Sequence, residues 1–524
     1  MLPRRSLLLA PLGAALATSL HRPAWAARDT VVIGASSPVP SLDPHISNTT
    51  SYNALGRHVF DRLIQQDASG TLRPGLATEW KAVSNTVWEF HLRPGVTWHD
   101  GRDFTADDVL FTFERLPSAA GGFVSVTRPI AKAEATDPLT LRIETKQPYP
   151  LLPNDLAALA IIARHAAEGA APEDWNNLRA AIGTGPYRYA AFQSGDRAEL
   201  VRNERYWGGV EPWAKVTYRF IGNDGARTAA LLAGDVDLID QVPSTDLARL
   251  KRDSRLSVTQ SQGVRLIYLQ TDFSREVAPP GVSAADGKPL ERNPFLDVRV
   301  RRALTLAIDR QALADRVMEG TASPTGQWLP PGSYSYHPEI PVPTADAEAA
   351  RRLLAEAGFP EGLRVTLSTP NDRYPNDAKV CQAVAQMWTR IGVRTTVEAV
   401  PWSVYLARGQ QQAYGVRLGG WGSSTGEASY LLRNVLSTYS QGRGSANFSR
   451  YSNPELDALT ERAVVTLDDA QREAILRQAT KLAIEDVGLI PLFLLGNSWA
   501  SRKELHYEAR RDEFTLAANL RPAG

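Results

Sequence analysis

The sequence predicts an α/β protein built from two or three globular units. A chain of 524 residues is too long for a single core, since one core stops growing at about 250–300 residues. From residue 293 onward, predicted strands alternate with long amphipathic helices, which is typical of α/β layering. Several short strands between residues 64 and 183 favour an α+β module in the first unit.

The N-terminus has the pattern of an export signal. Arg4 and Arg5 precede an apolar run over residues 7–20, and a small-x-small cleavage site ends at Ala26. The run is too short to span a membrane. We therefore predict a signal peptide over residues 1–26, exported either by the general secretory route or by the twin-arginine route.

The first unit begins with a strand and a helix that are joined by a polar loop. Apolar residues over 29–34 favour the strand, and residues 52–63 have the composition of a helix. The loop contains four small polar residues, Ser47, Asn48, Thr49 and Thr50. They precede a predicted helix, so they either cap it or offer hydrogen bonds to a ligand.

The most informative segment spans residues 88–114. Apolar and polar residues alternate at its start, which is the period of a half-buried strand. Turn residues follow at 93–95 and at 100–101. Thr105 then precedes two carboxylates, which suits the positive N-terminal end of a helix. The segment therefore predicts a strand, two turns and a helix.

The later elements follow from the same two periodicities. We predict helices over residues 226–232, 300–308, 349–357, 377–391 and 454–486. We predict strands over residues 264–270, 363–369, 393–400 and 489–495. The tail from Asn497 is expected to return to the first unit. A single cysteine, Cys381, excludes an internal disulfide.

Several of these blocks resemble the characteristic segments of one protein family. Residues 88–109 read W-x-F-x-L-R-x-G-V-x-W-x-D-G-x-x-F-x-A-x-D-V, which is similar to the family 5 extracellular solute-binding proteins. Those are the dipeptide, oligopeptide, glutathione and nickel receptors of bacterial ABC importers. Further blocks match in the same order, at residues 183–187, 203–207, 230–237, 294–301 and 354–360.

This resemblance implies an α/β fold with two lobes, the periplasmic-binding-protein fold of the cluster C type, with an extra α+β subdomain in the first lobe. The implied division places lobe Ia at residues 27–63, 184–268 and 496–524, lobe Ib at 64–183, and lobe II at 269–495. A ligand binds between the lobes, and hinge closure buries it.

The resemblance also implies what the protein does. It predicts a periplasmic receptor that captures a peptide or peptide-like solute and delivers it to the permease of an ABC importer. It further implies a monomer without enzymatic activity and without a cofactor. The energy for import would come from a separate ATPase, consistent with the absence of a G-x-x-x-x-G-K-[ST] phosphate loop in this chain. A formal net charge of +1 gives no reason to expect a nucleic-acid partner.

Three places match ligand-contacting positions of peptide-binding relatives. The polar loop over residues 47–50 is the first. Arg373 matches the arginine that pairs with a dipeptide's carboxylate, or it is a solvated loop residue. Trp402 is either a ligand contact or a core aromatic. The third place also includes a loop with Trp421, Ser423, Ser424, Thr425 and Glu427.

This last loop departs from the pattern of peptide receptors. Those proteins often read G-W-x-x-D, and the aspartate anchors the ligand's α-ammonium, whereas this chain has Ser424 at that position. Glu427 either substitutes for the aspartate or begins the following helix. The loop is more similar to that of glutathione-binding members, so ordinary dipeptide specificity is in question.

Other ligands and one enzymatic interpretation stay open. The same fold serves metal chelates, opines and sugars. None of the eight histidines forms an H-x-x-x-H pair, so direct nickel binding is not favoured. Residues 422–426 match the G-x-S-x-G pattern of α/β-hydrolases, with Ser424 as nucleophile, but His506 is the only histidine downstream.

Overall fold

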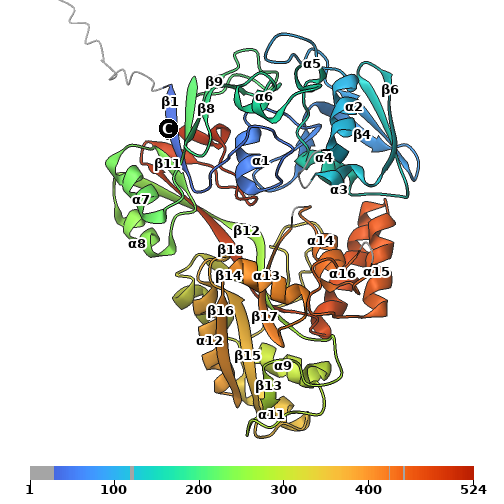
Figure 1. The fold of residues 1–524 in the computed structure, drawn as a ribbon, viewed down its shortest axis with the longest axis vertical. Coiled ribbons are helices and arrows are strands. Elements are labelled where there is room, and N and C mark those ends of the chain that lie inside the picture. The colour runs from blue at the N-terminus through green and yellow to red at the C-terminus, as the bar shows by residue number, and fades with distance from the viewer. Residues whose placement is uncertain (1–28, 119–122, 424, 441–442, 524) are drawn as a thin grey trace, which may run out of the picture.

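The chain forms an upper and a lower lobe (Figure 1). The computed structural model describes residues 29–118, 123–423, 425–440 and 443–523. We call the described residues before Gly263 and after Gly496 the upper lobe, and those between them the lower lobe (Figure 1). The predicted signal peptide and Ser424 lie outside the described residues. Among the described helices, none is long and apolar enough to cross a membrane.

One sheet of twelve strands runs through both lobes, in the order β13-β15-β17-β12-β18-β11-β1-β10-β9-β8, with β14 paired to β18 and β16 to β15. The upper lobe contributes β1 (Thr30–Ala35), β8 (Tyr187–Gln193), β9 (Arg197–Arg202), β10 (Lys215–Phe220) and β11 (Leu238–Asp240). The lower lobe contributes β13 (Val282–Ala284), β14 (Ala322–Pro324), β15 (Leu363–Pro370), β16 (Val393–Val400) and β17 (Val416–Gly422). Two long strands cross between the lobes, β12 (Leu256–Thr271) and β18 (Ile490–Arg502).

The two crossing strands are interrupted where they pass from one lobe to the other. Their antiparallel ladder breaks between Gln262 and Leu266. A Cβ on Gly263 would lie 2.6 Å from the carbonyl oxygen of Leu495, and one on Gly496 would lie 2.8 Å from another carbonyl oxygen. Only glycine fits such close backbone approaches, and the broken ladder makes this crossing the joint between the lobes.

The upper lobe has a core around its half of the large sheet. That core also takes in α1 (Thr50–Gly56), α6 (Pro172–Asn176) and the C-terminal strands β19 (Leu505–Tyr507) and β20 (Leu520–Pro522). Trp213 Nε1 donates a hydrogen bond of 2.9 Å to the Leu520 carbonyl oxygen. The Ala517 amide donates one of 2.9 Å to His58 Nε2. The C-terminal tail is therefore tied into the upper lobe.

A smaller α+β subdomain extends the upper lobe and has a core of its own. Its sheet has the order β4-β5-β7-β6. The strands are β4 (Ala77–Ala82), β5 (Val87–Leu92), β6 (Ile130–Asp137) and β7 (Thr140–Thr145). The helices are α2 (Ala106–Arg115), α3 (Val124–Thr127), α4 (Leu152–Ala158) and α5 (Arg164–Ala167). Thr105 and Asp108 form a capping box at α2, so the strand and helix predicted within residues 88–114 are confirmed.

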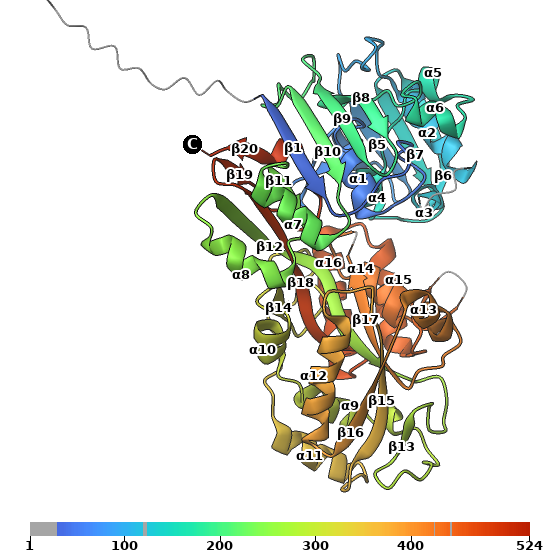
Figure 2. The ribbon, with the colours of Figure 1, turned by 60° about the vertical axis from the view of Figure 1, so that its left-hand side comes forward.

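The lower lobe has one core on each face of its part of the sheet. Neighbouring residues of β12 divide between the two cores, as expected for the two-residue period of a strand. One face packs against α9 (Val298–Leu306), α11 (Ala347–Glu356) and α12 (Asp377–Thr389), and the other against α14 (Ser429–Leu431), α15 (Pro454–Val465) and α16 (Asp469–Glu485). Figure 2 shows α12 and α11 beside β16 and β15.

Two predicted helices differ in length from those observed. The helix expected over 52–63 ends at Gly56, because the buried His58 ring bonds to the Ala54 carbonyl oxygen at 2.9 Å and anchors the turn that follows. The helix expected over 454–486 is two helices. Asp468 begins the second one by accepting a hydrogen bond of 2.8 Å from the Gln471 amide.

Candidate functional site

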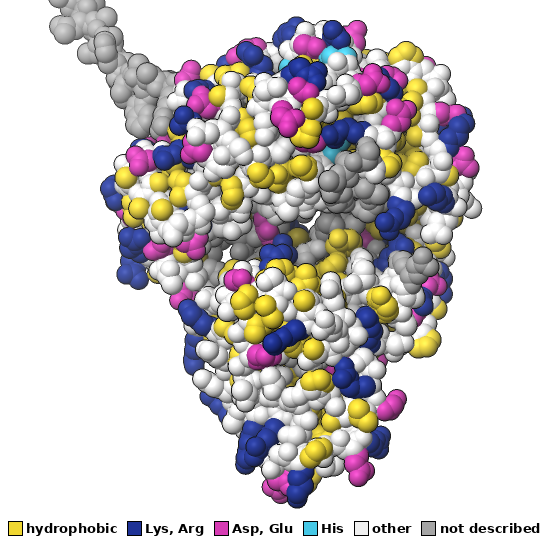
Figure 3. Space-filling model, viewed as in Figure 1, with side chains coloured by type: hydrophobic (Ala, Val, Ile, Leu, Met, Phe, Trp, Pro, Cys, Tyr) yellow, Lys and Arg dark blue, Asp and Glu magenta, His cyan; other side chains and the backbone are white. Residues whose placement is uncertain are grey.

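A hollow separates the two lobes in the space-filling view (Figure 3). The crossing strands β12 and β18 join the lobes beside it (Figure 1). Two-lobed proteins bind ligands where the lobes meet, because a ligand there contacts both and shifts the balance between open and closed forms. A solute bound in this hollow would contact an upper and a lower wall.

The upper wall contains a pocket of about 390 Å³ between the end of β1 and the start of α1. Its lining is Ala35, Ser36, Ser37, Thr50, Ser51, Ala54, Leu55, Tyr218, Phe220, Asp240, Gln241, Glu513 and Thr515. The Ser36 amide donates a hydrogen bond of 2.8 Å to Asp240 Oδ1, which fixes the chain after β1. Burial raises the pKa of the Asp240 carboxyl above its usual value, and nearby Arg227 opposes that rise.

The predicted polar loop leads into this pocket. Thr50 lines the pocket, and Asn48, exposed, accepts a hydrogen bond of 2.8 Å from Asn53 Nδ2. Ser47 Oγ donates a longer bond of 3.4 Å to Thr49 Oγ1. Thr49 occupies the N-cap position of α1, but its side chain makes no capping hydrogen bond. The Thr49 hydroxyl therefore does not cap the helix, and a ligand-binding role for residues 47–50 stays a prediction.

The lower wall brings two of the predicted residues together. Arg373 is exposed, and its guanidinium carbon lies 5.4 Å from the Tyr374 ring centre and 5.5 Å from that of Trp402. Trp402 begins α13 (Trp402–Gln410), and its amide donates a hydrogen bond of 2.8 Å to Asp372 Oδ1. Its ring also stacks on Tyr405 at 6.0 Å. Trp402 is therefore half-buried, with one side against the lobe and one beside Arg373.

Tyr374 ties this cluster to the end of β17. Its hydroxyl donates a hydrogen bond of 3.3 Å to the Gly420 carbonyl oxygen. A Cβ on Gly420 would come within 2.5 Å of the Tyr374 ring, so the close approach requires glycine. Trp421 follows and packs against the Tyr430 ring at 5.3 Å. Its indole N–H is buried and has no acceptor among the described residues.

The loop after β17 is held mainly by its own lobe. Ser423 Oγ donates a hydrogen bond of 3.1 Å to the Glu427 carbonyl oxygen. The Glu427 carboxylate is 2% exposed, pairs with Arg472 at 2.7 Å and accepts a hydrogen bond from Ser429. Both of its oxygens are thus occupied within the lower lobe, which leaves little capacity for a ligand's ammonium group. Thr425 is buried, and its carbonyl oxygen accepts a hydrogen bond of 2.9 Å from Asn154 Nδ2 of the upper lobe.

A pair of residues that the sequence analysis missed joins the two walls. Arg265, on β12 in the lower lobe, lies 3.4 Å from Glu513 in the C-terminal tail. Glu513 lines the upper pocket, and the Arg265 guanidinium lies 3.6 Å from the place of a Cβ on Gly422. The pair therefore places the upper pocket beside the start of the loop that contains Trp421. No motif or periodicity links the two residues, so no local signal was available to find them.

The comparison with protein families agrees with this architecture. Residues 71–443 match the model of the bacterial extracellular solute-binding proteins, family 5 (middle). This chain belongs to that family. The family 5 receptor is 28% identical to the heme-binding protein A of Haemophilus influenzae, which it matches over 87% of its own length and 85% of the relative. It is 29% identical to the glutathione-binding protein GsiB of Pectobacterium atrosepticum, over 91% and 90% of the two chains.

The fold of the receptor is that of solved periplasmic binding proteins. The periplasmic murein tripeptide-binding protein MppA, in its unliganded open form, superposes with a TM-score of 0.80 at 24% identity. The match covers 94% of the receptor and 97% of MppA. The predicted fold, two lobes with an α+β subdomain in the first, is therefore confirmed, while the exact residue boundaries of the lobes stay a prediction.

The described side chains offer no grouping suited to a metal ion. Among the described residues, no three histidine, cysteine, aspartate or glutamate side chains come together as a possible metal site. The cleft walls of the receptor instead offer hydroxyls, backbone amides, aromatic rings and one exposed guanidinium. This set suits an organic solute with hydrogen-bonding groups and a carboxylate.

Proposed function

We propose that this family 5 receptor binds a small peptide or peptide-like solute between its lobes, in the periplasm, and passes it to the permease of an ABC importer. The observation that carries the proposal is the state of Arg373. Its side chain is exposed, makes no ion pair with a carboxylate of the described residues, and is supported by two aromatic rings. A guanidinium held in this way matches the planar geometry of a carboxylate.

The opposite wall offers groups that can hydrogen bond to a peptide backbone. The upper pocket combines hydroxyls with the backbone of the chain after β1, and both can hydrogen bond to a peptide. We propose that Ser47, Asn48, Thr49 and Thr50 contact the ligand there, and that Trp402, Trp421, Ser423, Ser424 and Thr425 contact it from below. Glu427 is the one candidate that we assign to the lower lobe's own structure, because Arg472 neutralises it.

The identity of the ligand is best established by experiments that do not assume its class. Native mass spectrometry of protein purified from the periplasm would detect a solute that copurifies with it. A thermal-shift screen of dipeptides, tripeptides, glutathione, hemin, an opine, a sugar and a nickel–histidine chelate would then rank the classes. A ligand at a hundred times its Kd stabilises the folded protein by about 2.7 kcal/mol, so a true ligand stands out. Stabilisation by the sugar or the metal chelate alone would contradict a peptide-like ligand.

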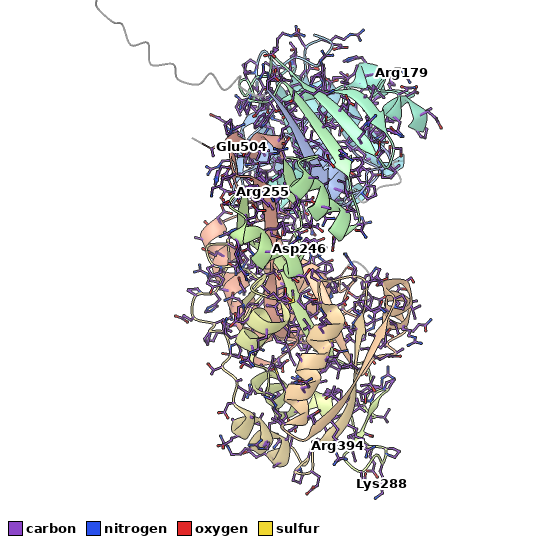
Figure 4. All side chains as sticks on the ribbon, turned by 90° about the vertical axis from the view of Figure 1, so that its left-hand side faces the viewer. Arg179, Asp246, Arg255, Lys288, Arg394 and Glu504 are labelled. Carbon is purple, nitrogen blue, oxygen red and sulfur yellow. The ribbon has the colours of Figure 1, made fainter. Side chains whose placement is uncertain are left out.

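The role of Arg373 is tested with a matched control. Arg373→Met is expected to weaken binding of the ligand about 10- to 100-fold, the value of one charge-assisted hydrogen-bonded pair. Arg394→Met removes another exposed arginine from the far end of the lower lobe (Figure 4) and should leave the Kd unchanged. Equal Kd values for both variants and the wild type, measured by calorimetry, would remove Arg373 from the site.

Three further parts of the proposal have separate tests. N-terminal sequencing of the exported protein should begin after Ala26, if residues 1–26 are a signal peptide. Light scattering should give the mass of a monomer. Wild type should hydrolyse no activated ester, whereas a burst of product that is lost in Ser424→Ala would support the hydrolase interpretation instead.

A further inference from the structure

A buried arginine without a counter-ion lies in the lower lobe, away from the cleft. Arg417 is on β17, four residues before Trp421, which is about 13 Å along a strand. The residue is 6% exposed. Among the described residues no carboxylate pairs with it, and its Nε and Nη1 atoms are buried without a hydrogen-bond acceptor. Burying a charge is costly unless another group compensates it.

Three aromatic rings surround the guanidinium group. Its carbon lies 4.7 Å from the centre of the Phe448 ring, 4.9 Å from that of Tyr405 and 5.9 Å from that of Tyr414. The negative faces of such rings attract a cation. A ring face accepts a hydrogen bond only weakly, whereas a guanidinium directs five N–H bonds outward in its own plane. The rings therefore explain part of the burial but leave Nε and Nη1 without strong acceptors.

The carbonyl groups at the end of α13 do not supply these acceptors. A Cβ on Gly409 would lie 2.6 Å from Arg417 Nη1, so the guanidinium packs against the last turn of this helix. The Gly409 carbonyl oxygen accepts a hydrogen bond of 3.1 Å from the Gln412 amide. The Arg408 carbonyl oxygen accepts bonds of 3.1 Å from two amides of the turn that follows. The backbone thus already engages both groups.

A small pocket lies at this end of the side chain. Arg417, Gly409, Gln270 and Ser449 are among its lining residues, and the space inside is about that of one water molecule. Gln270, on β12, is the cross-strand partner of Arg417 and is 1% exposed. Its Nε2 makes only a long hydrogen bond of 3.4 Å, to Ser449 Oγ. The pocket therefore has two donor side chains, one of them charged, whose hydrogen bonds are incompletely used.

The charge balance of the pocket favours an anion over a water molecule. Asp272 also lines the pocket, but its carboxylate pairs with Arg275 at 2.8 Å and accepts a hydrogen bond of 3.1 Å from the Ser274 amide. These two side chains compensate each other. The charge of Arg417 is therefore not balanced by the described side chains of the pocket. A water molecule can accept its hydrogen bonds, whereas an anion also compensates its charge.

We infer that this pocket binds one small inorganic anion, of the charge and size of chloride, between Arg417 and Gln270. Phosphate and larger anions exceed the space. The anion links β12, β17 and the segment that contains Ser449, and thereby stabilises the lower lobe. The site is separate from the cleft, so it does not depend on which solute the receptor carries.

The first test is the dependence of stability on chloride at constant ionic strength. Thermal unfolding is followed by tryptophan fluorescence while sodium chloride replaces sodium gluconate, whose anion is too bulky for the pocket. An ion that binds only the folded protein raises the unfolding midpoint, by about 1 °C for each tenfold increase in chloride above the Kd. Arg417→Met should remove this dependence. The control Arg394→Met, which changes an exposed arginine of the same lobe, should keep it.

The second test needs no variant. Crystals of the wild type soaked in sodium bromide should show anomalous scattering from a bromide ion beside the Arg417 guanidinium. If Arg417→Met does not fold, this position and the midpoints of the wild type in the two salts decide the matter. Equal midpoints in chloride and gluconate would overturn the inference, even with bromide in the crystal, because the pocket would then hold an adventitious ion only. A water molecule in place of bromide would overturn it as well.

Discussion

The ion pair between Glu427 and Arg472 allows a direct test of the role of Glu427 in the loop after β17. The sequence left two roles open for Glu427, an anchor for a ligand's ammonium group or a part of the following helix. Its carboxylate is 2% exposed and lies 2.7 Å from Arg472, which is itself buried. We therefore expect Glu427→Gln to destabilise the fold while leaving ligand binding nearly intact.

The size of the effect follows from burial. Removing one partner of a buried pair leaves the other charge without compensation, at a cost of about 3–5 kcal/mol. Glu427→Gln should lower the free energy of unfolding by that amount, because Arg472 stays charged in a dry place. Replacing both, as in Glu427→Gln with Arg472→Met, removes the uncompensated charge and should recover most of the loss.

Two measurements separate the roles. Urea unfolding, followed by tryptophan fluorescence, gives the free energy for the wild type, the single variant and the double variant. Calorimetry with the ligand found by native mass spectrometry gives the Kd. A role as ammonium anchor predicts the opposite outcome, namely normal stability with a Kd weakened about 10- to 100-fold. That result for Glu427→Gln would refute the structural role.

Two other perturbations test the site and the core. Gly420→Ala places a Cβ within 2.5 Å of the Tyr374 ring, so it should cost about 1–3 kcal/mol of stability. It should also weaken ligand binding, because a shift of Tyr374 displaces Arg373. In the control Gly56→Ala the added Cβ meets open space, so stability and binding should stay as in the wild type. Burial lowers the pKa of His58 to about 4, so unfolding lets it bind a proton below its unfolded pKa of about 6.5. Protonation of unfolded His58 should therefore lower the free energy of unfolding by up to about 1.4 kcal/mol per pH unit between pH 6.5 and 4, as measured by urea titrations. This decrease should be smaller in His58→Gln. In the control His506→Gln, which changes an exposed histidine, the decrease should equal that of the wild type.

Much of the fold was predictable because its signals are local. The strand, turns and helix over residues 88–114 depend on alternation, turn chemistry and a capping threonine, all within one segment. The strand predicted at 393–400 has the observed bounds for the same reason. The lengths of β12 and β18 were not predictable, because each strand continues only where the other pairs with it across the lobes.

The candidate site likewise contains some residues that the sequence identified and others that it could not identify. Arg373 and Trp402 were recognised by their place in family-like segments, and the structure brings their side chains within 5.5 Å. The residues whose contacts determine the roles of other site residues were not recognisable from the sequence. Arg472, which neutralises Glu427, lies 45 residues further along the chain. Nothing in the residues around Glu427 indicates such a partner, so the sequence alone left its role undecided.

The contacts between the two lobes also have no signal in the local sequence. Asn154 looks like an ordinary helix residue in sequence, and its importance comes only from the carbonyl group that the other lobe places 2.9 Å away. The same holds for Leu467, which reads as a loop leucine and yet covers the core of the α+β subdomain. Residues that contact the ligand leave traces in local sequence, because each must carry a particular chemistry. Residues that join the lobes need only meet in space, so contacts between the lobes can be made where no binding motif is present.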